Sequence, residues 1–114
     1  MRVIIIEDEE LAAERLEKML IETAPETEVI AKLSSVKESV KWLTLNKADL
    51  IFLDIQLSDG LSFSIFEQIT VKTPVIFTTA YDQYAIKAFN LNSVSYLLKP
   101  VRKNELTEAL QKYK

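Results

Sequence analysis

The sequence predicts one α/β domain: a doubly wound, five-stranded parallel sheet with helices on both faces. Short runs rich in β-branched residues alternate with longer amphipathic stretches, which is typical of repeated βα units. Several of these runs are apolar at successive positions, as expected for strands covered on both faces. With 114 residues, 48% of them hydrophobic and 27% charged, the composition is that of an ordinary folded domain with one core.

Five short apolar runs are the predicted strands. In chain order they are Val3–Ile6, Val29–Leu33, Leu50–Leu53, Val75–Thr79 and Val94–Leu98. The first run contains only valine and isoleucine, which indicates a central strand buried on both faces. The second run is less apolar and predicts a weaker strand.

Between the strands, apolar residues recur at spacings of three and four, so each stretch can pack one helical face on the sheet. The first helix begins near Glu10 and ends before Pro25, because proline disfavours helical geometry in the preceding residue. Ser34 and Ser35 can cap the second helix. The only glycine, Gly60, lies in a polar segment and predicts a turn. The other helices are expected at about Ser62–Thr70, Tyr84–Leu91 and Lys103–Tyr113.

The composition excludes several kinds of chemistry. The chain has no cysteine and no histidine, so disulfides, thiolate chemistry and an imidazole base are ruled out. A net charge of −3 without a long basic run argues against nucleic-acid binding by this segment itself. The apolar run at the start stops at Glu7, too early for a signal peptide or a membrane span. We therefore expect a cytoplasmic protein with no membrane partner.

Polar groups stand at the ends of four of the predicted strands. Glu7-Asp8-Glu9, Asp54 and Lys99-Pro100 follow the first, third and fifth strands, and Thr78-Thr79 are the last residues of the fourth. The carboxyl ends of parallel strands meet at one rim of the sheet, where such folds bind ligands. Carboxylates gathered at this rim repel one another unless they are protonated or neutralised. A divalent cation resolves that conflict.

Magnesium fits this set because it prefers one or two carboxylates, several waters and a phosphate oxygen. Glu7, Asp8 and Asp54 supply the carboxylates. With Mg²⁺ (or Mn²⁺) bound, Asp54 stays ionised and can act as a nucleophile toward phosphorus. Lys99 and the Thr79 hydroxyl can then stabilise the charge on the phosphoryl oxygens.

Over essentially its whole length, the chain resembles the receiver domains of two-component response regulators. The matching segments are Ile4-Ile5-Ile6-Glu7-Asp8-Glu9, Leu53-Asp54-Ile55, Phe77-Thr78-Thr79-Ala80 and Tyr96-Leu97-Leu98-Lys99-Pro100. The resemblance implies a flavodoxin-like fold with strand order 2-1-3-4-5. It also implies a signalling switch in which a sensor histidine kinase phosphorylates Asp54. Such a domain is not an enzyme in the usual sense, although it catalyses its own phosphorylation and dephosphorylation.

The same resemblance assigns the metal ligands. Asp8 and Asp54 would bind Mg²⁺ directly, Glu7 would help through water, and the backbone carbonyl of Gln56 would be a further ligand. Lys99 would contact the phosphoryl group.

Thr79 and Tyr96 would form the switch pair. Strand alternation lets only one of Thr78 and Thr79 face the site, and the neighbouring segment favours Thr79 by resemblance. The alternative role for Tyr96 is that of a packed strand aromatic with its hydroxyl at the surface. Gln56 and Tyr81 lie two residues beyond Asp54 and Thr79, and we expect both to tune the phosphorylated lifetime.

Two departures from the family pattern concern the strand ends. Glu7 stands where aspartate is more common, and Ser95 stands where glycine is frequent. Neither removes a required group. The bond between Lys99 and Pro100 is expected to be cis, a form essentially confined to proline.

Residues 77–89 resemble, more narrowly, receivers that precede LytTR-type (LytR/AlgR-like) DNA-binding domains. We expect residues 1–114 to be an excised receiver, with any C-terminal output domain absent from this chain. DNA would then be bound only through that missing domain. Activation would form a homodimer through the Tyr84–Leu91 helix, the last strand and the last helix.

Three other functions compete with this interpretation. A flavodoxin-like cofactor binder is disfavoured, because Glu7-Asp8-Glu9 would repel a flavin phosphate. A phosphatase of the aspartyl-phosphate type needs a second acid two residues after the nucleophile, where this chain has Gln56. A receiver that never takes phosphate and acts only by protein contact stays open, although the complete acidic set argues against it. Separately, Lys99 alone could be a structural ion-pair donor to Asp54.

Overall fold

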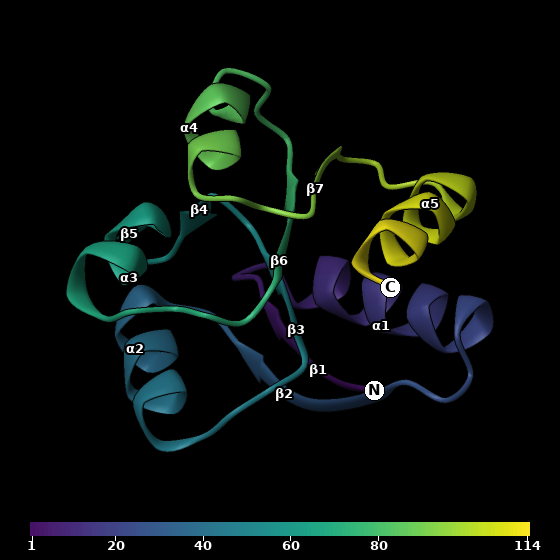
Figure 1. The fold of residues 1–114 in the computed structure, drawn as a ribbon, viewed down its shortest axis with the longest axis horizontal. Coiled ribbons are helices and arrows are strands. Elements are labelled where there is room, and N and C mark those ends of the chain that lie inside the picture. The colour runs from purple at the N-terminus through teal and green to yellow at the C-terminus, as the bar shows by residue number, and fades with distance from the viewer.

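The computed structural model describes residues 1–114 and contains a five-stranded parallel sheet with helices on both faces (Figure 1). The sheet strands are β1 (Arg2–Ile6), β2 (Glu28–Leu33), β3 (Leu50–Leu53), β6 (Val75–Thr79) and β7 (Ser95–Leu98). Their spatial order is β2-β1-β3-β6-β7, and every neighbouring pair is parallel. Numbered along the chain, this order is 2-1-3-4-5, so the predicted fold class is confirmed.

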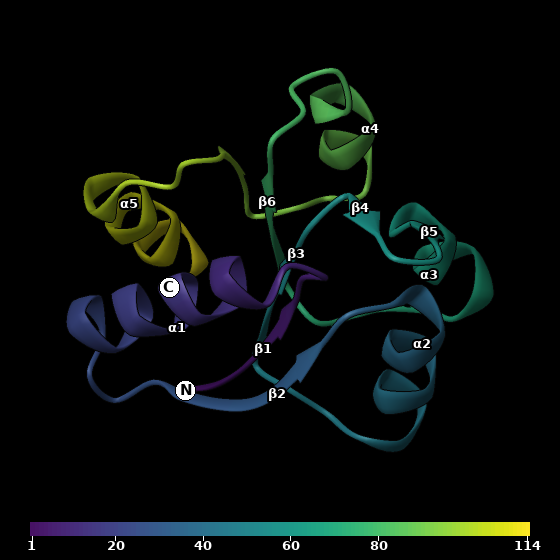
Figure 2. The same cartoon turned by 180° about the vertical axis from the view of Figure 1, so that it is seen from behind.

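Helices cover the two faces of the sheet unequally. Helices α1 (Glu10–Thr23) and α5 (Lys103–Tyr113) pack on one face. The other face carries α2 (Val36–Leu45), α3 (Phe63–Gln68) and α4 (Ala85–Asn90), as the view from behind in Figure 2 also shows. None of these helices is both long and apolar enough to cross a membrane.

Two hydrophobic clusters explain why the central strands are apolar at every position. Val3 and Ile5 belong to the cluster under α1 and α5, whereas Ile4 and Ile6 belong to the cluster on the opposite face. Successive side chains of a strand point to opposite faces, so a strand covered on both sides needs apolar residues throughout. The core therefore consists of two layers separated by the sheet.

The structure differs from the sequence prediction mainly after Asp54. The segment expected to be a polar loop forms a small antiparallel hairpin of β4 (Gln56–Leu57) and β5 (Gly60–Leu61). Gly60 has a φ of +143°, a conformation that other residues rarely adopt. Helix α3 is shorter than expected at both ends because Ser62 only precedes it and Ile69 is already extended.

Other local expectations are confirmed. Ser35 caps α2, since its side chain accepts a hydrogen bond from the Glu38 amide at 3.0 Å. The Lys99–Pro100 peptide bond is cis. Helix α4 is one residue shorter at each end than expected, and β7 begins at Ser95 instead of Val94.

Candidate functional site

The carboxyl ends of the central strands are joined by backbone hydrogen bonds just beyond the sheet ladder. The amide of Asp54 donates to the Ile6 carbonyl at 2.9 Å, which ties the residue after β3 to the end of β1. The amide of Lys99 donates to the Thr79 carbonyl at 2.8 Å, which does the same for β7 and β6. The polar residues after four strands therefore share one rim, as the sequence predicted.

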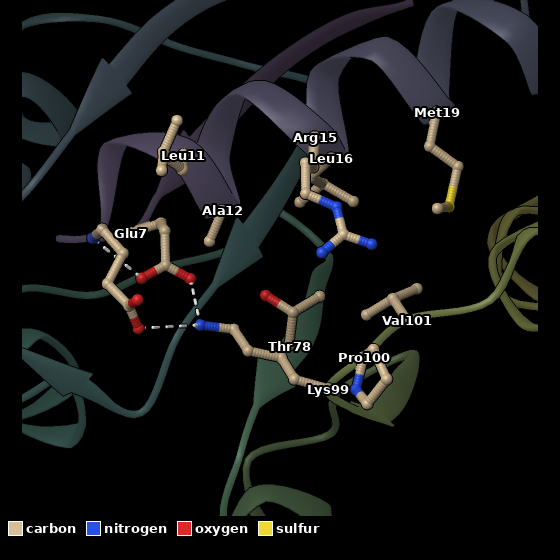
Figure 3. A pocket seen from close by; sticks show the side chains of 11 residues that line it. Glu7, Leu11, Ala12, Arg15, Leu16, Met19, Thr78, Lys99, Pro100 and Val101 are labelled. Atoms are coloured by element: carbon tan, nitrogen blue, oxygen red, sulfur yellow. Dashed lines mark hydrogen bonds and ion pairs between the residues drawn. The ribbon is translucent and has the colours of Figure 1, made fainter.

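The Lys99 ammonium is the centre of an ion cluster at this rim. Its Nζ lies 2.5 Å from Glu7 Oε1, 3.1 Å from Asp54 Oδ2 and 3.9 Å from Glu9 Oε1. Figure 3 shows the Lys99 side chain extended toward Glu7 beneath the start of α1. Asp54 is only 5% exposed and Glu7 is similarly buried. The Lys99 ammonium is thus the ion-pair partner of three carboxylates, and two of them, those of Glu7 and Asp54, are buried.

The electrostatics of the cluster reflect this shortage of positive charge. Burial raises the pKa of Glu7 from 4.5 to about 7, and the charge of Asp54 adds to the rise. Hydrogen bonds from Lys99 and from the Glu9 amide oppose it. Burial lowers the pKa of Lys99, but its contacts with Glu7 and Asp54 outweigh this effect, so the pKa is raised overall. Ionised Glu7 therefore destabilises the metal-free fold.

We predict that Glu7→Gln stabilises the protein at alkaline pH in the presence of a chelator. Because the pKa of Glu7 is raised in the folded state, its stabilising contribution is present below pH 4.5 and is lost as the pH rises through about 7. At pH 8 the variant should gain about 1–3 kcal/mol in unfolding free energy, at about 1.4 kcal/mol per pKa unit.

Urea denaturation across the pH range measures this gain. Exposed Glu67, which has no hydrogen-bond or ion-pair partner, provides a matched control as Glu67→Gln. An equal gain for Glu7→Gln at pH 4 and pH 8 would show that Glu7 ionisation is not the cause.

The acidic residues at the rim fit a hard divalent cation. Carboxylate oxygens of Glu7, Asp8 and Glu9 lie within 4.8 Å of one another. In addition, Asp54 Oδ1 is buried and has no hydrogen-bond partner. Oxygen ligands of this kind suit Mg²⁺. Glu9 was not among the residues predicted to bind metal, although it belongs to the acidic run that drew attention to the site.

Thr78 and Thr79 point to different sides, as strand alternation requires. Thr78 lines a cavity of about 450 Å³ together with Glu7 and Lys99 (Figure 3). Thr79 is fully buried, and its Oγ1 accepts a hydrogen bond from the Tyr81 amide at 3.4 Å. Thr79 is thus held next to Tyr81.

Tyr96 is a half-buried tyrosine of β7, one of the two roles considered for it, and its switch role stays a prediction. Its ring packs against Phe77 with centroids 6.1 Å apart, and its hydroxyl donates a hydrogen bond to the Tyr81 carbonyl. Burial raises the pKa of Tyr96, and the charge of Asp82 acts in the same direction. Consequently, one backbone segment at Tyr81 contacts both Thr79 and Tyr96.

Gln56 lies at the start of β4, two residues beyond Asp54, and its side chain is exposed. Tyr81 is partly exposed and packs edge-on against Tyr84, with ring centroids 6.3 Å apart. Neither side chain forms a hydrogen bond with the Asp54 carboxylate, whose partner is Lys99. Their expected influence on the phosphorylated lifetime therefore stays a prediction.

Comparison with known proteins identifies close relatives. The response regulator receiver domain family matches residues 3–111. The sensory transduction protein LytT of Bacillus anthracis is 40% identical over 117 residues, covering 100% of this chain and 47% of LytT. The transcriptional regulatory protein LytR of Staphylococcus aureus (strain N315) is 39% identical over 115 residues, covering 98% and 46%. The chain spans about half the length of these curated relatives.

Solved structures agree with the sequence relatives. The response regulatory domain of protein mrkE from Klebsiella pneumoniae superimposes with a TM-score of 0.86 at 35% identity, covering 99% of this chain and 94% of that one. The receiver domain of PhyR from Erythrobacter litoralis has a TM-score of 0.81 at 23% identity, which speaks for the fold alone. With its family match and its strand-end acids and lysine, this chain belongs to the receiver domains of two-component response regulators and is a homologue of the LytT and LytR regulators.

Proposed function

We propose that this receiver is a cytoplasmic switch controlled by phosphorylation. In this switch, Asp54 accepts a phosphoryl group from a sensor histidine kinase. The single observation that carries the proposal is the environment of Asp54. Its carboxylate is buried at the carboxyl end of β3, with Oδ2 on the Lys99 ammonium and Oδ1 without a partner. One oxygen is therefore held by Lys99, while the other has no partner within the protein.

In the reaction, an oxygen of Asp54 forms a bond to phosphorus while the bond from phosphorus to the kinase histidine nitrogen breaks. Lys99 and the Thr79 hydroxyl hold the phosphoryl oxygens. Hydrolysis of the aspartyl phosphate by water at the same site returns the receiver to its resting state. The chain thus catalyses both its phosphorylation and its dephosphorylation.

Mg²⁺ would be held by Asp8, Asp54 and the Gln56 carbonyl, with Glu7 assisting. When bound, it neutralises charge on the carboxylates and on the incoming phosphoryl group. Glu9 joins this set because its carboxylate lies in the same acidic group as those of Glu7 and Asp8. The unpartnered Oδ1 of Asp54 supports this assignment.

The switch would pass from Thr79 to Tyr96 through the backbone at Tyr81. If the Thr79 hydroxyl turns toward a phosphoryl oxygen, its hydrogen bond with the Tyr81 amide breaks. The Tyr81 carbonyl, which accepts a hydrogen bond from Tyr96, can then shift. Phosphorylation then changes the populations of two conformations of this region.

The output would be a homodimer that controls a C-terminal DNA-binding domain of the LytTR type. Helix α4 and strand β7 expose large apolar side chains: Ile86 is 79% exposed, Phe89 75% and Leu98 44%. Apolar patches of this kind mark protein interaction sites. They support the α4 and β7 parts of a dimer face that would also include α5.

Phosphorylation in vitro tests the central proposal. Wild-type protein incubated with acetyl phosphate and Mg²⁺ should gain the mass of one phosphoryl group, and Asp54→Asn should gain none. Asp49→Asn is the control, because Asp49 precedes β3 at the opposite end of the sheet. Wild-type protein that gains no phosphate, even with its kinase, would refute the proposal.

Tyr81→Ala should speed autodephosphorylation, because we expect the Tyr81 ring to restrict the attacking water. The decay of phosphorylated protein after removal of acetyl phosphate measures the rate. Tyr113→Ala, which changes a tyrosine of α5 outside this region, is the comparison. A rate equal to or slower than that of the wild type would exclude this role for the ring.

A further inference from the structure

The hairpin that follows Asp54 is fixed at both of its ends. The amide of Ser62 donates to the Ile55 carbonyl at 2.7 Å, which closes the hairpin at its base. Leu57 buries its side chain in the cluster under α2 and α3. Figure 1 shows β4 and β5 above α2, on the same side of the sheet.

The tip of the hairpin is bound to the start of α2. The carboxylate of Asp59 accepts hydrogen bonds from two backbone amides. The Val36 amide donates to Oδ1 at 2.7 Å, and the Lys37 amide donates to Oδ2 at 3.1 Å. Ser58 adds a hydrogen bond from its hydroxyl to the Ser34 carbonyl at 3.1 Å. The hairpin and the helix are thus joined by contacts between residues more than twenty positions apart in sequence.

These contacts are chemically favourable. The first amides of a helix lack partners within the helix, and a carboxylate there also meets the positive end of the helix dipole. Ser35 caps the next amide, that of Glu38, from within the helix itself. Asp59 therefore satisfies amides that Ser35 does not, and it does so from a different part of the chain.

The position of Asp59 relative to the proposed metal ligands gives these contacts a function. Gln56, whose carbonyl is a proposed ligand, lies three residues before Asp59 in the same hairpin. Mg²⁺ requires near-ideal octahedral geometry with ligands at about 2.0–2.1 Å, so small displacements of a ligand carbonyl weaken binding. A rigid attachment of the hairpin to α2 would hold that carbonyl in place.

We propose that Asp59 is a positioning residue of the phosphoacceptor site, which sets the Mg²⁺ affinity by fixing the β4–β5 hairpin to the start of α2. The proposal rests on the function proposed above. Asp59 contacts no reacting group and acts only through the hairpin that carries Gln56.

The test compares wild-type protein with Asp59→Asn and Asp59→Ala, using MgCl₂ alone as the probe in isothermal titration calorimetry at high salt. Loss of a residue that orients a metal ligand weakens binding by about tenfold or more, which we expect for both variants. In phosphorylation by acetyl phosphate, the Mg²⁺ concentration for half-maximal rate should rise to the same extent. The rate at saturating Mg²⁺ should stay near the wild-type value.

Two controls separate positioning from charge and from stability. Glu67→Gln removes the same charge from an exposed position of α3, and this variant should bind Mg²⁺ as the wild type does. Ser35→Ala weakens the start of α2 without touching the hairpin, and its Mg²⁺ affinity should also be unchanged.

Wild-type affinity in Asp59→Asn, or an equal loss in Ser35→Ala, would overturn the positioning role. If wild-type protein neither binds Mg²⁺ nor accepts phosphate, the proposed function itself fails and the inference fails with it. The two failures are thus distinguishable.

Discussion

Replacing Lys99 with methionine should slow the phosphorylation of Asp54 by acetyl phosphate by about 10²- to 10³-fold, the usual cost of removing one preorganised donor from a reacting oxyanion. The Lys99 ammonium lies 3.1 Å from Asp54 and 2.5 Å from Glu7, and it is the one cation among three carboxylates. Methionine keeps the length of the side chain and removes its charge. Rates of mass gain at saturating Mg²⁺ measure the effect.

Lys103→Met is the matched control for this loss of charge. Lys103 pairs with Glu22 at 3.5 Å, and both side chains are largely exposed. Exposed pairs of this kind contribute about 0–1 kcal/mol, so phosphorylation should be unaffected. A wild-type rate for Lys99→Met would show that the ammonium only stabilises the unphosphorylated acids.

Phe77→Ala should destabilise the fold by about 3–5 kcal/mol, the usual cost of removing a buried phenylalanine ring. Phe77 on β6 is fully buried, and its ring centroid lies 5.9 Å from that of Phe63, 6.5 Å from Phe66 and 6.1 Å from Tyr96. Its loss removes the ring that packs against two aromatic side chains of α3 and one of β7. Urea denaturation should show a lower midpoint with an unchanged slope.

Phe89→Ala provides the comparison, because Phe89 on α4 is 75% exposed. Removing an exposed ring should change the unfolding free energy by less than about 0.5 kcal/mol. Equal losses for the two variants would mean that the ring of Phe77 does not hold the α3 side of the core together.

The strands of the sheet were predictable because burial on both faces leaves a direct mark on the sequence. Val3 to Ile6 must be apolar at each position when helices pack on either side, and the structure places them alternately in the two clusters. The rim followed from the same argument, since parallel strands end together. Asp54, Glu7 and Lys99 were therefore expected to meet, and they do.

The hairpin after Asp54 was not predictable in the same way. Its strands have two residues each, so no periodic pattern can develop, and Gly60 alone indicated a turn. The role of Asp59 at α2 was missed because its partners are backbone amides, which have no sequence signature. Glu9 was left out of the metal set because the family resemblance assigned roles only to Glu7 and Asp8 among the three consecutive acids, whereas the structure groups all three carboxylates.

The hydrogen bonds at Tyr81 bear on which substitutions at this position the receiver can tolerate. Thr79 and Tyr96 reach this residue through its amide and its carbonyl, groups that every residue except proline possesses. The side chain at position 81 is thus not needed for the connection between them. If Tyr81 sets the phosphorylated lifetime and Tyr96 receives the signal, as proposed, substitutions at position 81 would change how long the signal lasts without breaking its path to Tyr96.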